Sequence, residues 1–407
     1  MNIISQGLSP CRTVGRWLRV QYALCLDMQD MQEPSTSSLS ERINGATEKV
    51  VPGIKHANLS RLVKPNMTQT ATQTIYLPNP LKDVSWPWGR RMNPFYDEVK
   101  KEADNWFLSL ECFDEKSTNS FVRCDFARMA ALCYPDMTRE EYRVACDMFT
   151  LFFVFDEFTD IVDGKGAQEL ADLTVQPLKN LAYECGKNEH PLTKVAFRFW
   201  KHFMAIASGT CKELFISAWK QYIDGVIQEA KDRQERTIPR SFDTGDYLRL
   251  RKLTAGVAPC IAIYFIGKEC PRGFFGHPML IRLAEITIEI VCFENDTYSF
   301  QKESATEDIH NLLKAIMYDH VCSVQDAVYH AAGETKARAE EFLMLAKTLQ
   351  SQGPDVQAYI QDLGSLISGH TLWSFETPRY FGKDCKKVEK DRTFILTEEK
   401  KRLVCWE

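Results

Sequence analysis

The sequence lacks the patterns that mark several protein classes. Its 14 cysteines are scattered singly with no C-x-x-C pair, so no zinc or redox spacing is present. Reduced, buried thiols in a cytosolic protein are the plain interpretation. No apolar run reaches membrane-spanning length. The net charge is -5, which argues against a nucleic-acid partner, so an anionic substrate must be held by a few placed cations or by metal.

The first part of the chain has no core-forming pattern. Three arginines precede the first acidic residue, Asp27, as in an organellar presequence. Residues 28–75 are rich in Ser, Thr, Gln and Asn, which is typical of disorder. We therefore expect residues 1–75 to be a disordered or mitochondrial targeting extension, or an over-extended gene start with Met67 as the true beginning.

From Asn93 onward the hydrophobic pattern is helical. Apolar residues recur at spacings of three and four, and Pro or Gly marks the breaks. Residues 286–291 carry many β-branched side chains but are predicted helical from the length and flanks of their segment. We expect one all-α domain over residues 76–383 and a surface tail over residues 384–407. The predicted helical segments are 121–134, 139–163, 168–185, 191–208, 211–232, 244–268, 278–302, 305–319, 322–350 and 354–376.

An acidic cluster directly follows an aromatic run at residues 152–160. On a helix, Asp156 and Asp160 lie on one face, about 6 Å apart along the axis. Like charges placed in that way repel, which is unfavourable for a purely structural helix. Hard divalent cations would remove the conflict, since magnesium prefers carboxylate and phosphate oxygens. The alternative is a solvated acidic helix end.

A second polar pattern combines Asn295, Ser299 and Glu303, spaced at i, i+4 and i+8. One helix face would present amide, hydroxyl and carboxylate oxygens, which can hold one magnesium ion and leave room for phosphate oxygens. Lys302 is adjacent and could reach a phosphate as a point charge. An ordinary polar helix face is the alternative.

A third motif ends the helical region. Arg379 offers a planar donor fork for phosphate, and Tyr380 adds a hydroxyl donor. An Arg-Tyr pair alone carries no information. Its position after the other two motifs makes it informative.

In this order the three motifs resemble the D-(D/E/N)-x-x-D, N-D-x-x-S-x-x-x-E and R-Y elements of microbial class I terpene synthases, and they are most similar to those of basidiomycete sesquiterpene synthases. The resemblance covers about residues 78–383. It implies a single helical bundle around a central active-site cavity, and a lyase that cyclises farnesyl diphosphate with magnesium. Supporting stretches are Trp86-Pro87-Trp88, Asn93-Pro94, Arg123-Cys124-Asp125-Phe126, Val154-Phe155-Asp156-Glu157 and Trp373-Ser374-Phe375-Glu376-Thr377.

The resemblance also implies metal ligands. Asp156 would bind two of three magnesium ions, supported by Glu157 and Asp160. The third ion would be bound by the second motif, Asn295, Ser299 and Glu303.

Contacts to the diphosphate follow from the same resemblance. Lys302, Arg379 and Tyr380 would contact it directly. Arg251 fits best as the arginine that senses the diphosphate, with Arg249 as a rival by spacing. Ala255 or Gly256 could act as the effector that follows this arginine.

An allylic cation needs an apolar pocket that excludes water. Phe152, Phe153 and Trp373 are the expected wall, since aromatic faces stabilise cations by about 0.5–2 kcal/mol each. Plain core packing is the alternative for these rings. No side-chain base is required, because the released diphosphate can accept the proton.

Two other functional hypotheses for the chain stay open. A chain-elongating prenyl diphosphate synthase shares the helical fold, but it would need a second aspartate-rich motif where this chain has Asn295, Ser299 and Glu303. A catalytically silent helical binding protein would not need three intact motifs. Within the synthase reading, the flanks favour closure of carbon 1 onto carbon 11 and a protoilludene-type product. The protein is expected to be a cytoplasmic monomer or homodimer.

Overall fold

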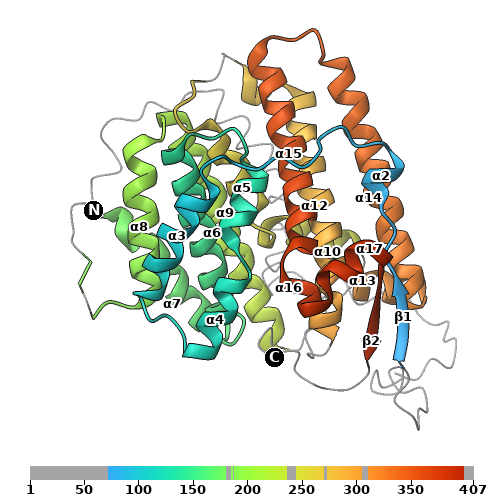
Figure 1. Cartoon of the computed structure of the whole chain (residues 1–407), viewed down its shortest axis with the longest axis horizontal. Coiled ribbons are helices and arrows are strands. Elements are labelled where there is room, and N and C mark those ends of the chain that lie inside the picture. Colours follow the sequence, from blue (N-terminus) through green and yellow to red (C-terminus); the bar gives the residue numbers. More distant parts are fainter. Residues whose placement is uncertain are drawn as a thin grey trace, which may run out of the picture.

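The structure, a computed structural model, describes residues 72–179, 185–186, 188–235, 244–269, 273–304 and 310–397. In this part of the chain helices dominate, and one two-stranded sheet lies at an edge (Figure 1). The predicted all-α class is confirmed. The expectations for residues 1–71 concern a part of the chain outside the described residues. Within the described part, no helix has the length and hydrophobicity that crossing a membrane requires.

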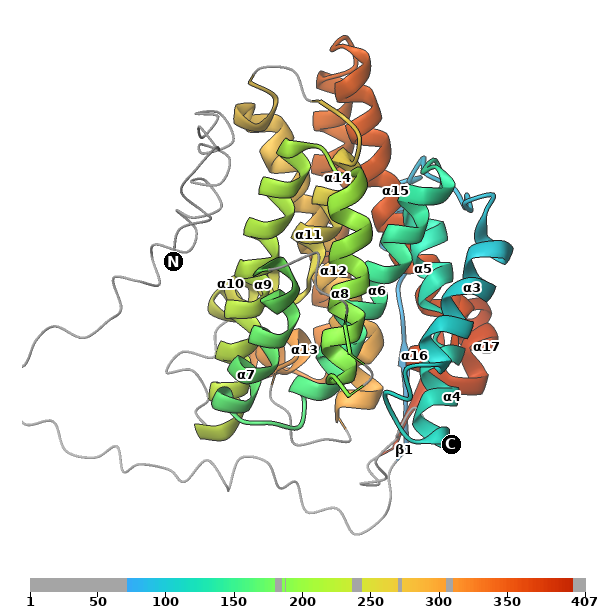
Figure 2. The ribbon, with the colours of Figure 1, turned by 90° about the vertical axis from the view of Figure 1, so that its left-hand side faces the viewer.

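The helices form two groups that lie side by side (Figure 1). In the first group α7 packs on α8 and α9, which Figure 2 shows near one another. The groups meet where α5 packs on α15 and where α9 packs on α10 and α11. The first group contains α3 (Tyr96–Leu108), α4 (Glu115–Arg123), α5 (Phe126–Cys133), α6 (Arg139–Thr159), α7 (Gly164–Val175), α8 (Pro191–Ile206) and α9 (Gly209–Glu235).

The second group continues the chain. A short helix near the start of the described chain, α2 (Pro80–Asp83), packs on it against α14. The group contains α10 (Thr244–Thr254), α11 (Val257–Ala262), α12 (Pro278–Ser304), α13 (Leu312–His320), α14 (Val324–Thr348), α15 (Pro354–Glu376), α16 (Pro378–Phe381) and α17 (Cys385–Asp391).

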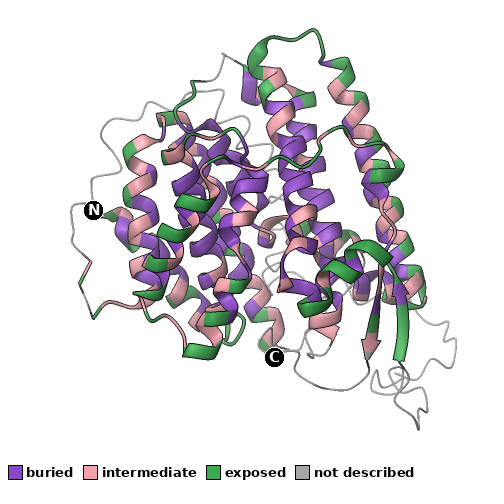
Figure 3. Ribbon diagram, viewed as in Figure 1, coloured by how far each residue is buried: buried purple, intermediate pink, exposed green. Residues whose placement is uncertain are grey.

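The core lies along the inner helices of both groups. Buried residues concentrate on α5, α6, α12 and α15 (Figure 3). Helix α6 begins at a capping box, in which the Thr138 hydroxyl accepts from the backbone of Glu141 and the Glu141 carboxylate accepts from the backbone of Thr138. The apolar residues that follow are buried on most faces, so α6 carries its acidic last turn into the interior of the molecule.

Two helices that the sequence predicts as continuous are broken. The segment predicted over 121–134 is interrupted at Asp125, which has a φ of 50° and caps α5 by accepting from the backbone of Arg128. The segment predicted over 244–268 is interrupted before α11 by Gly256, which has a φ of 68°. Each prediction was wrong for the same reason: one residue in the left-handed region ends a helix without changing the hydrophobic period.

The ends of the described chain pair with each other. Strand β1 (Thr72–Tyr76) is antiparallel to β2 (Thr393–Thr397), with Ile75 opposite Phe394 and both side chains buried (Figure 1). The expected boundaries at residues 75 and 384 therefore do not match the folded unit, since β1 crosses the first and α17 and β2 lie beyond the second. This sheet joins distant parts of the sequence, so no local pattern indicates it.

Candidate active site

A cavity of about 810 Å³ opens between the two groups of helices. Its charged residues come from the C-terminal parts of α6, α9, α10 and α12 and from α16, and apolar residues such as Phe149, Val291 and Leu366 line it as well. The structure brings the predicted residues of all three motifs to this one cavity. Its lining includes Phe152, Phe153, Asp156, Asp160, Arg251, Asn295, Ser299, Lys302, Glu303, Trp373, Arg379 and Tyr380.

The last turn of α6 places the first motif at the cavity. The Asp156 side chain is 44% exposed there, whereas the neighbouring Phe155 is fully buried. Burial of the region raises the pKa of Asp156, which Arg379 opposes and Glu157 reinforces. Desolvation by the surrounding protein and the Asp156 carboxylate together raise the pKa of Asp160 well above its usual range, although Asp160 itself lies at an exposed helix end. Two neighbouring carboxylates that resist joint ionisation form a site that a divalent cation would stabilise.

Glu157 follows Asp156 and is held more closely by the same arginine, Arg379. Its carboxylate accepts a 2.9 Å hydrogen bond from Nη1 of Arg379, and it does not line the cavity. Although burial acts in the opposite direction, Arg379 and Lys302 lower the pKa of Glu157. Glu157 therefore holds an arginine in place and remains ionised, in line with the supporting role that the resemblance implies.

The second motif lies on α12, opposite side chains that fix its orientation. The Asn295 amide donates to the Tyr380 hydroxyl at 2.8 Å, and its oxygen accepts from Nη2 of Arg251 at 2.7 Å. The Glu303 carboxylate accepts from the Asn311 amide at 2.9 Å. Ser299, 3% exposed, lies one helical turn from each of the other two.

The geometry distinguishes the two rival arginines on α10. Arg251 lines the cavity and donates from Nε to Asp296 at 2.8 Å. Asp296 is 1% exposed and also accepts from the Tyr247 hydroxyl at 2.6 Å, so it anchors Arg251 from within the wall. The Arg249 side chain is 50% exposed and ion-paired with Asp246. Of the two, only Arg251 is placed to meet a ligand in the cavity.

The break between α10 and α11 lies against the aromatic wall. Ala255 and Gly256 both line the cavity one turn after Arg251. A Cβ atom at Gly256 would come within 2.9 Å of the Phe152 ring, and its positive φ also disfavours other residues. The close approach of backbone to ring therefore requires glycine here.

The third motif links the acidic motif to the second one. Arg379 is 7% exposed and donates from Nη1 to Glu157. Its other terminal nitrogen, Nη2, lies 3.7 Å from Oδ2 of Asp156. Its guanidinium carbon lies 5.2 Å from the centre of the Phe153 ring. The next residue, Tyr380, contacts Asn295, so adjacent residues of the third motif touch both predicted metal sites.

The predicted aromatic wall is packed on further rings. Phe153 stacks on Phe126 at 3.8 Å between centroids and lies 5.9 Å from Trp373. Phe152 packs against Trp219 at 5.0 Å and Tyr222 at 4.9 Å. Neighbouring rings on both sides restrict these side chains, which makes the wall rigid.

Sequence reasoning missed several charged residues of the cavity. Glu229, Asp232 and Arg233 on α9 line it, together with His310 and His370. The Thr254 hydroxyl donates to Glu229 at 2.7 Å, and Arg233 donates to the Thr159 carbonyl at 2.9 Å. Helical spacing on α9 is the one signal that relates Glu229 and Arg233, and it does not show which side of α9 meets a cavity. His370 lies near a buried carboxylate on α12, with its Nδ1 3.3 Å from Glu294.

The donor set of the two motifs suits magnesium. It consists of carboxylate, amide and hydroxyl oxygens, with no sulfur or imidazole ligand in either motif. Among the described residues, no three His, Cys, Asp or Glu side chains are grouped to hold a metal alone. Ions held by one or a few protein oxygens keep coordination positions for water and phosphate, as magnesium at substrate sites usually does.

Comparison with known proteins gives the family. Residues 147–341 match the family described as "Terpene synthase family 2, C-terminal metal binding". Sesquiterpene synthase Agr8 of Cyclocybe aegerita is 33% identical over 327 residues, covering 79% of this chain and 90% of that protein. Delta(6)-protoilludene synthase 18 of Postia placenta is 32% identical over 340 residues, covering 82% and 95%.

Solved structures show the same fold. Linalool/nerolidol synthase from Streptomyces clavuligerus aligns with a TM-score of 0.61 at 20% identity, over 71% of this chain and 98% of that one. An α-eudesmol synthase aligns with a TM-score of 0.61 at 21% identity, over 71% and 97%. The expected helical bundle around a central cavity is thus confirmed. With a metal-binding family match, close sequence relatives and this shared architecture, the chain belongs to the terpene synthase family, whose members are lyases that act on prenyl diphosphates.

Proposed function

We propose that this enzyme is a sesquiterpene synthase that ionises farnesyl diphosphate and cyclises the resulting cation, with release of diphosphate. The observation that carries the proposal is that three separate polar motifs line one cavity beside an aromatic wall. Relatives named sesquiterpene synthase and Delta(6)-protoilludene synthase support the fifteen-carbon substrate. A volume of about 810 Å³ falls within the range of sites that enclose small molecules.

Three magnesium ions are the proposed cofactor. Asp156, with Asp160 beside it, would hold two ions, and Asn295, Ser299 and Glu303 would hold the third. When bound, magnesium supplies positive charge that stabilises the departing diphosphate.

The side chains around the ions are oriented before substrate binds. Arg251 is held by Asn295 and Asp296, and Arg379 by Glu157. Donors fixed in this way stabilise charge on the leaving group without having to reorganise. Lys302 and Tyr380 add a charge and a hydroxyl from the same side of the cavity.

The aromatic wall would protect the cation and guide its folding. Phe152, Phe153 and Trp373 present rings whose faces attract positive charge, and they exclude water that would quench it. Arg379 lies over Phe153, so this ring separates the diphosphate end from the hydrocarbon part of the pocket. The wall must orient the distal double bond against carbon 1, because an unoriented cation loses its proton early.

We infer closure of carbon 1 onto carbon 11, which gives a humulyl cation and then a protoilludene-type tricycle. The named protoilludene synthases among the relatives support this route. Gas chromatography of the volatile product tests it. A main product of 1,10-closure, of the germacrene or cadinane type, would contradict it.

Replacement of one wall residue tests the role of the rings. Phe153→Ala should shift products toward acyclic or singly cyclised ones more than it weakens diphosphate binding, because Phe153 stacks within the wall and binds no metal. The measurement is product composition together with KM. Unchanged composition with a raised KM would assign Phe153 to substrate binding instead.

The remaining predictions concern the setting of the enzyme. Every cysteine in the described part of the chain has a free thiol, which supports a reducing compartment such as the cytoplasm. We infer that the enzyme works there as a monomer or homodimer, and size-exclusion chromatography with light scattering measures this directly.

A further inference from the structure

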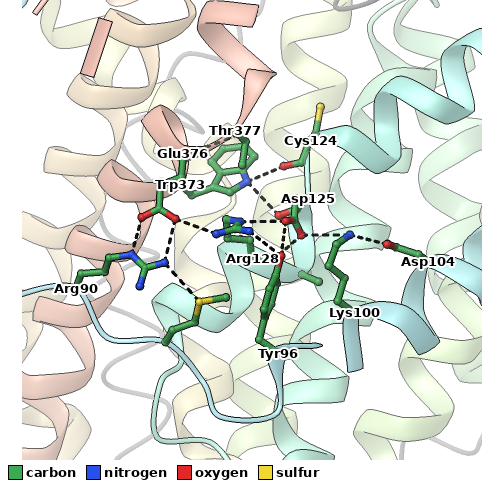
Figure 4. A network of polar contacts seen from close by, with 12 residues as sticks. Arg90, Tyr96, Lys100, Asp104, Cys124, Asp125, Arg128, Trp373, Glu376 and Thr377 are labelled. Atoms are coloured by element: carbon green, nitrogen blue, oxygen red, sulfur yellow. Dashed lines mark hydrogen bonds and ion pairs between the residues drawn. The ribbon is translucent and has the colours of Figure 1, made fainter. Parts of the chain in front are cut away.

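A polar network lies directly behind the aromatic wall, where α3, α5 and the end of α15 meet (Figure 4). Its centre is Asp125, in the link between α4 and α5, with φ 50° and ψ 60°. This residue belongs to the stretch Arg123-Cys124-Asp125-Phe126, and apart from capping α5 the Asp125 side chain has no role described above. Its left-handed backbone needs stabilisation by its surroundings, since a residue with a Cβ atom rarely adopts it.

Four groups stabilise the Asp125 carboxylate. It accepts from the Tyr96 hydroxyl at 2.5 Å, and from the backbone amide and Nε of Arg128 at 3.1 and 3.0 Å. Nζ of Lys100 lies 3.5 Å away. The side chain is 12% exposed, so these charge-assisted contacts are partly shielded from water. The carboxylate thus fixes one short link to both α3 and α5.

The same link holds the Trp373 ring. The indole Nε1 donates to the Cys124 carbonyl at 2.8 Å, and the Asp125 carbonyl lies at 3.2 Å from it (Figure 4). Trp373 is fully buried, and an indole has no other polar atom. The orientation of this wall residue is therefore tied to the backbone conformation at Asp125. The next residue, Phe126, supplies the ring on which Phe153 stacks.

A second contact ties the link to the end of α15. Nη1 of Arg128 donates to Glu376 at 3.0 Å, and Nε of Arg90 donates to the same carboxylate at 2.7 Å. Glu376 lies three residues after Trp373 and three before Arg379. Arg128 thus bridges the Asp125 and Glu376 carboxylates, on either side of Trp373 in space.

We propose that Asp125 is a positioning residue that sets the product of cyclisation by fixing the Trp373 and Phe126 rings, an inference that rests on the proposed sesquiterpene synthase activity. Its contacts reach the hydrocarbon wall but neither Asp156 nor Asn295. Loss of its carboxylate should disturb the wall more than the diphosphate end, because Arg379 is also held by Glu157 and Tyr380 by Asn295. Small displacements of a positioned group strongly change which reaction follows, so product choice should respond before ionisation does.

The test compares three variants with the wild type on farnesyl diphosphate and magnesium. Asp125→Ala removes the carboxylate and disfavours the left-handed backbone. In Asp125→Asn the asparagine can adopt this backbone conformation and keeps one oxygen acceptor. Asp114→Ala is the matched control, because Asp114 caps α4 through Ser117 and does not contact Trp373. Diphosphate release and product composition are measured on each folded variant.

We expect diphosphate release by Asp125→Ala to stay within about threefold of wild type. The ratio of main to early-terminated products should fall about fivefold or more, because small free-energy differences between competing routes change a ratio by such factors. Asp125→Asn keeps one oxygen acceptor but places an amide nitrogen against donors, so its ratio should lie between those of the wild type and Asp125→Ala, and Asp114→Ala should leave the ratio unchanged. Unchanged composition in Asp125→Ala, or an equal change in Asp114→Ala, would overturn the proposal.

A fourth variant tests the route through the indole. Trp373→Phe removes the N–H donor and keeps an aromatic ring. If Asp125 acts through that hydrogen bond, the double variant should match the stronger single variant instead of multiplying both effects. Multiplied effects would refute the route. Where Asp125→Ala does not fold, Tyr96→Phe, which removes one donor to the Asp125 carboxylate and lies outside the cavity lining, must shift the product ratio with release retained, and no shift would overturn the proposal. A wild type that makes no sesquiterpene would instead refute the proposed function.

Discussion

Replacement of Arg251 by lysine is the perturbation whose effect the structure defines best. The guanidinium donates from Nε to Asp296 at 2.8 Å and from Nη2 to Asn295 at 2.7 Å. A lysine ammonium keeps the charge, but it is a point donor on a flexible stem and cannot reproduce both bonds in one plane. Arg251→Lys should therefore remove the arginine donor from either Asp296 or Asn295 and remove the fork that faces the diphosphate.

The size of the effect follows from one lost charge-assisted hydrogen bond. Such a bond contributes about 1.5–3 kcal/mol. If the loss falls on the transition state, kcat/KM should decrease by about 10- to 150-fold. The same substitution removes a donor from the Asn295 oxygen, a proposed metal ligand, so the magnesium concentration for half-maximal rate should also change.

The assay is steady-state diphosphate release from farnesyl diphosphate over a range of magnesium concentrations. Arg249→Lys is the matched control, because Arg249 lies on the same helix but is half exposed and paired only with Asp246 among the contacts described. Exposed ion pairs contribute about 0–1 kcal/mol, so this variant should retain wild-type kinetics. Wild-type kcat/KM in Arg251→Lys, or an equal loss in both variants, would refute the assignment of Arg251.

Other perturbations have equally specific outcomes. Asp156→Ala and Asn295→Ala should each abolish turnover while circular dichroism shows an intact helical fold, and near-native activity of the Asp156 variant at millimolar magnesium would defeat the metal assignment. A chain that begins at Met67 should be soluble and active, whereas one lacking β1 should lose roughly 1.5–3 kcal/mol of stability as buried Ile75 is removed, measured as a lower Tm. Because burial raises the pKa of Asp156 and Asp160, protons should compete with magnesium above the usual carboxylate range. The half-saturating magnesium concentration should rise as the pH falls. As the pH falls, the metal-free protein should gain stability, since its folded state binds these protons more tightly than the unfolded chain does. Asp160→Asn should reduce both the rise in half-saturating magnesium and this gain in stability.

Local sequence patterns predicted the helices and the three motifs because both depend on short spacings. Asp156 and Asp160, or Asn295 and Ser299, share a helix face by periodicity alone. The choice of Arg251 over Arg249 needed the tertiary structure, because side chains two residues apart on a helix point to different sides and the sequence does not show which side meets the cavity. The bonds to Asn295 and Asp296 favour Arg251 as the residue that contacts the diphosphate.

What the sequence could not predict depends on contacts between distant residues. The pairing of β1 with β2 joins the two ends of the described chain, and the mixed charges after residue 384 resemble a surface tail. Glu229 carries no motif, and its place at the cavity follows from how α9 packs on α10. The role of Asp125 depends on a backbone conformation that its neighbours in sequence do not specify.

The most direct test of the account is a mass balance with wild-type enzyme, magnesium and farnesyl diphosphate. The account predicts one volatile cyclic fifteen-carbon product for each diphosphate released, no turnover without divalent metal, and weaker activity on ten- and twenty-carbon diphosphates. Formation of a longer prenyl diphosphate would identify a chain-elongating synthase instead. Binding without release of diphosphate would indicate a silent binding protein, and either result would contradict the proposed function.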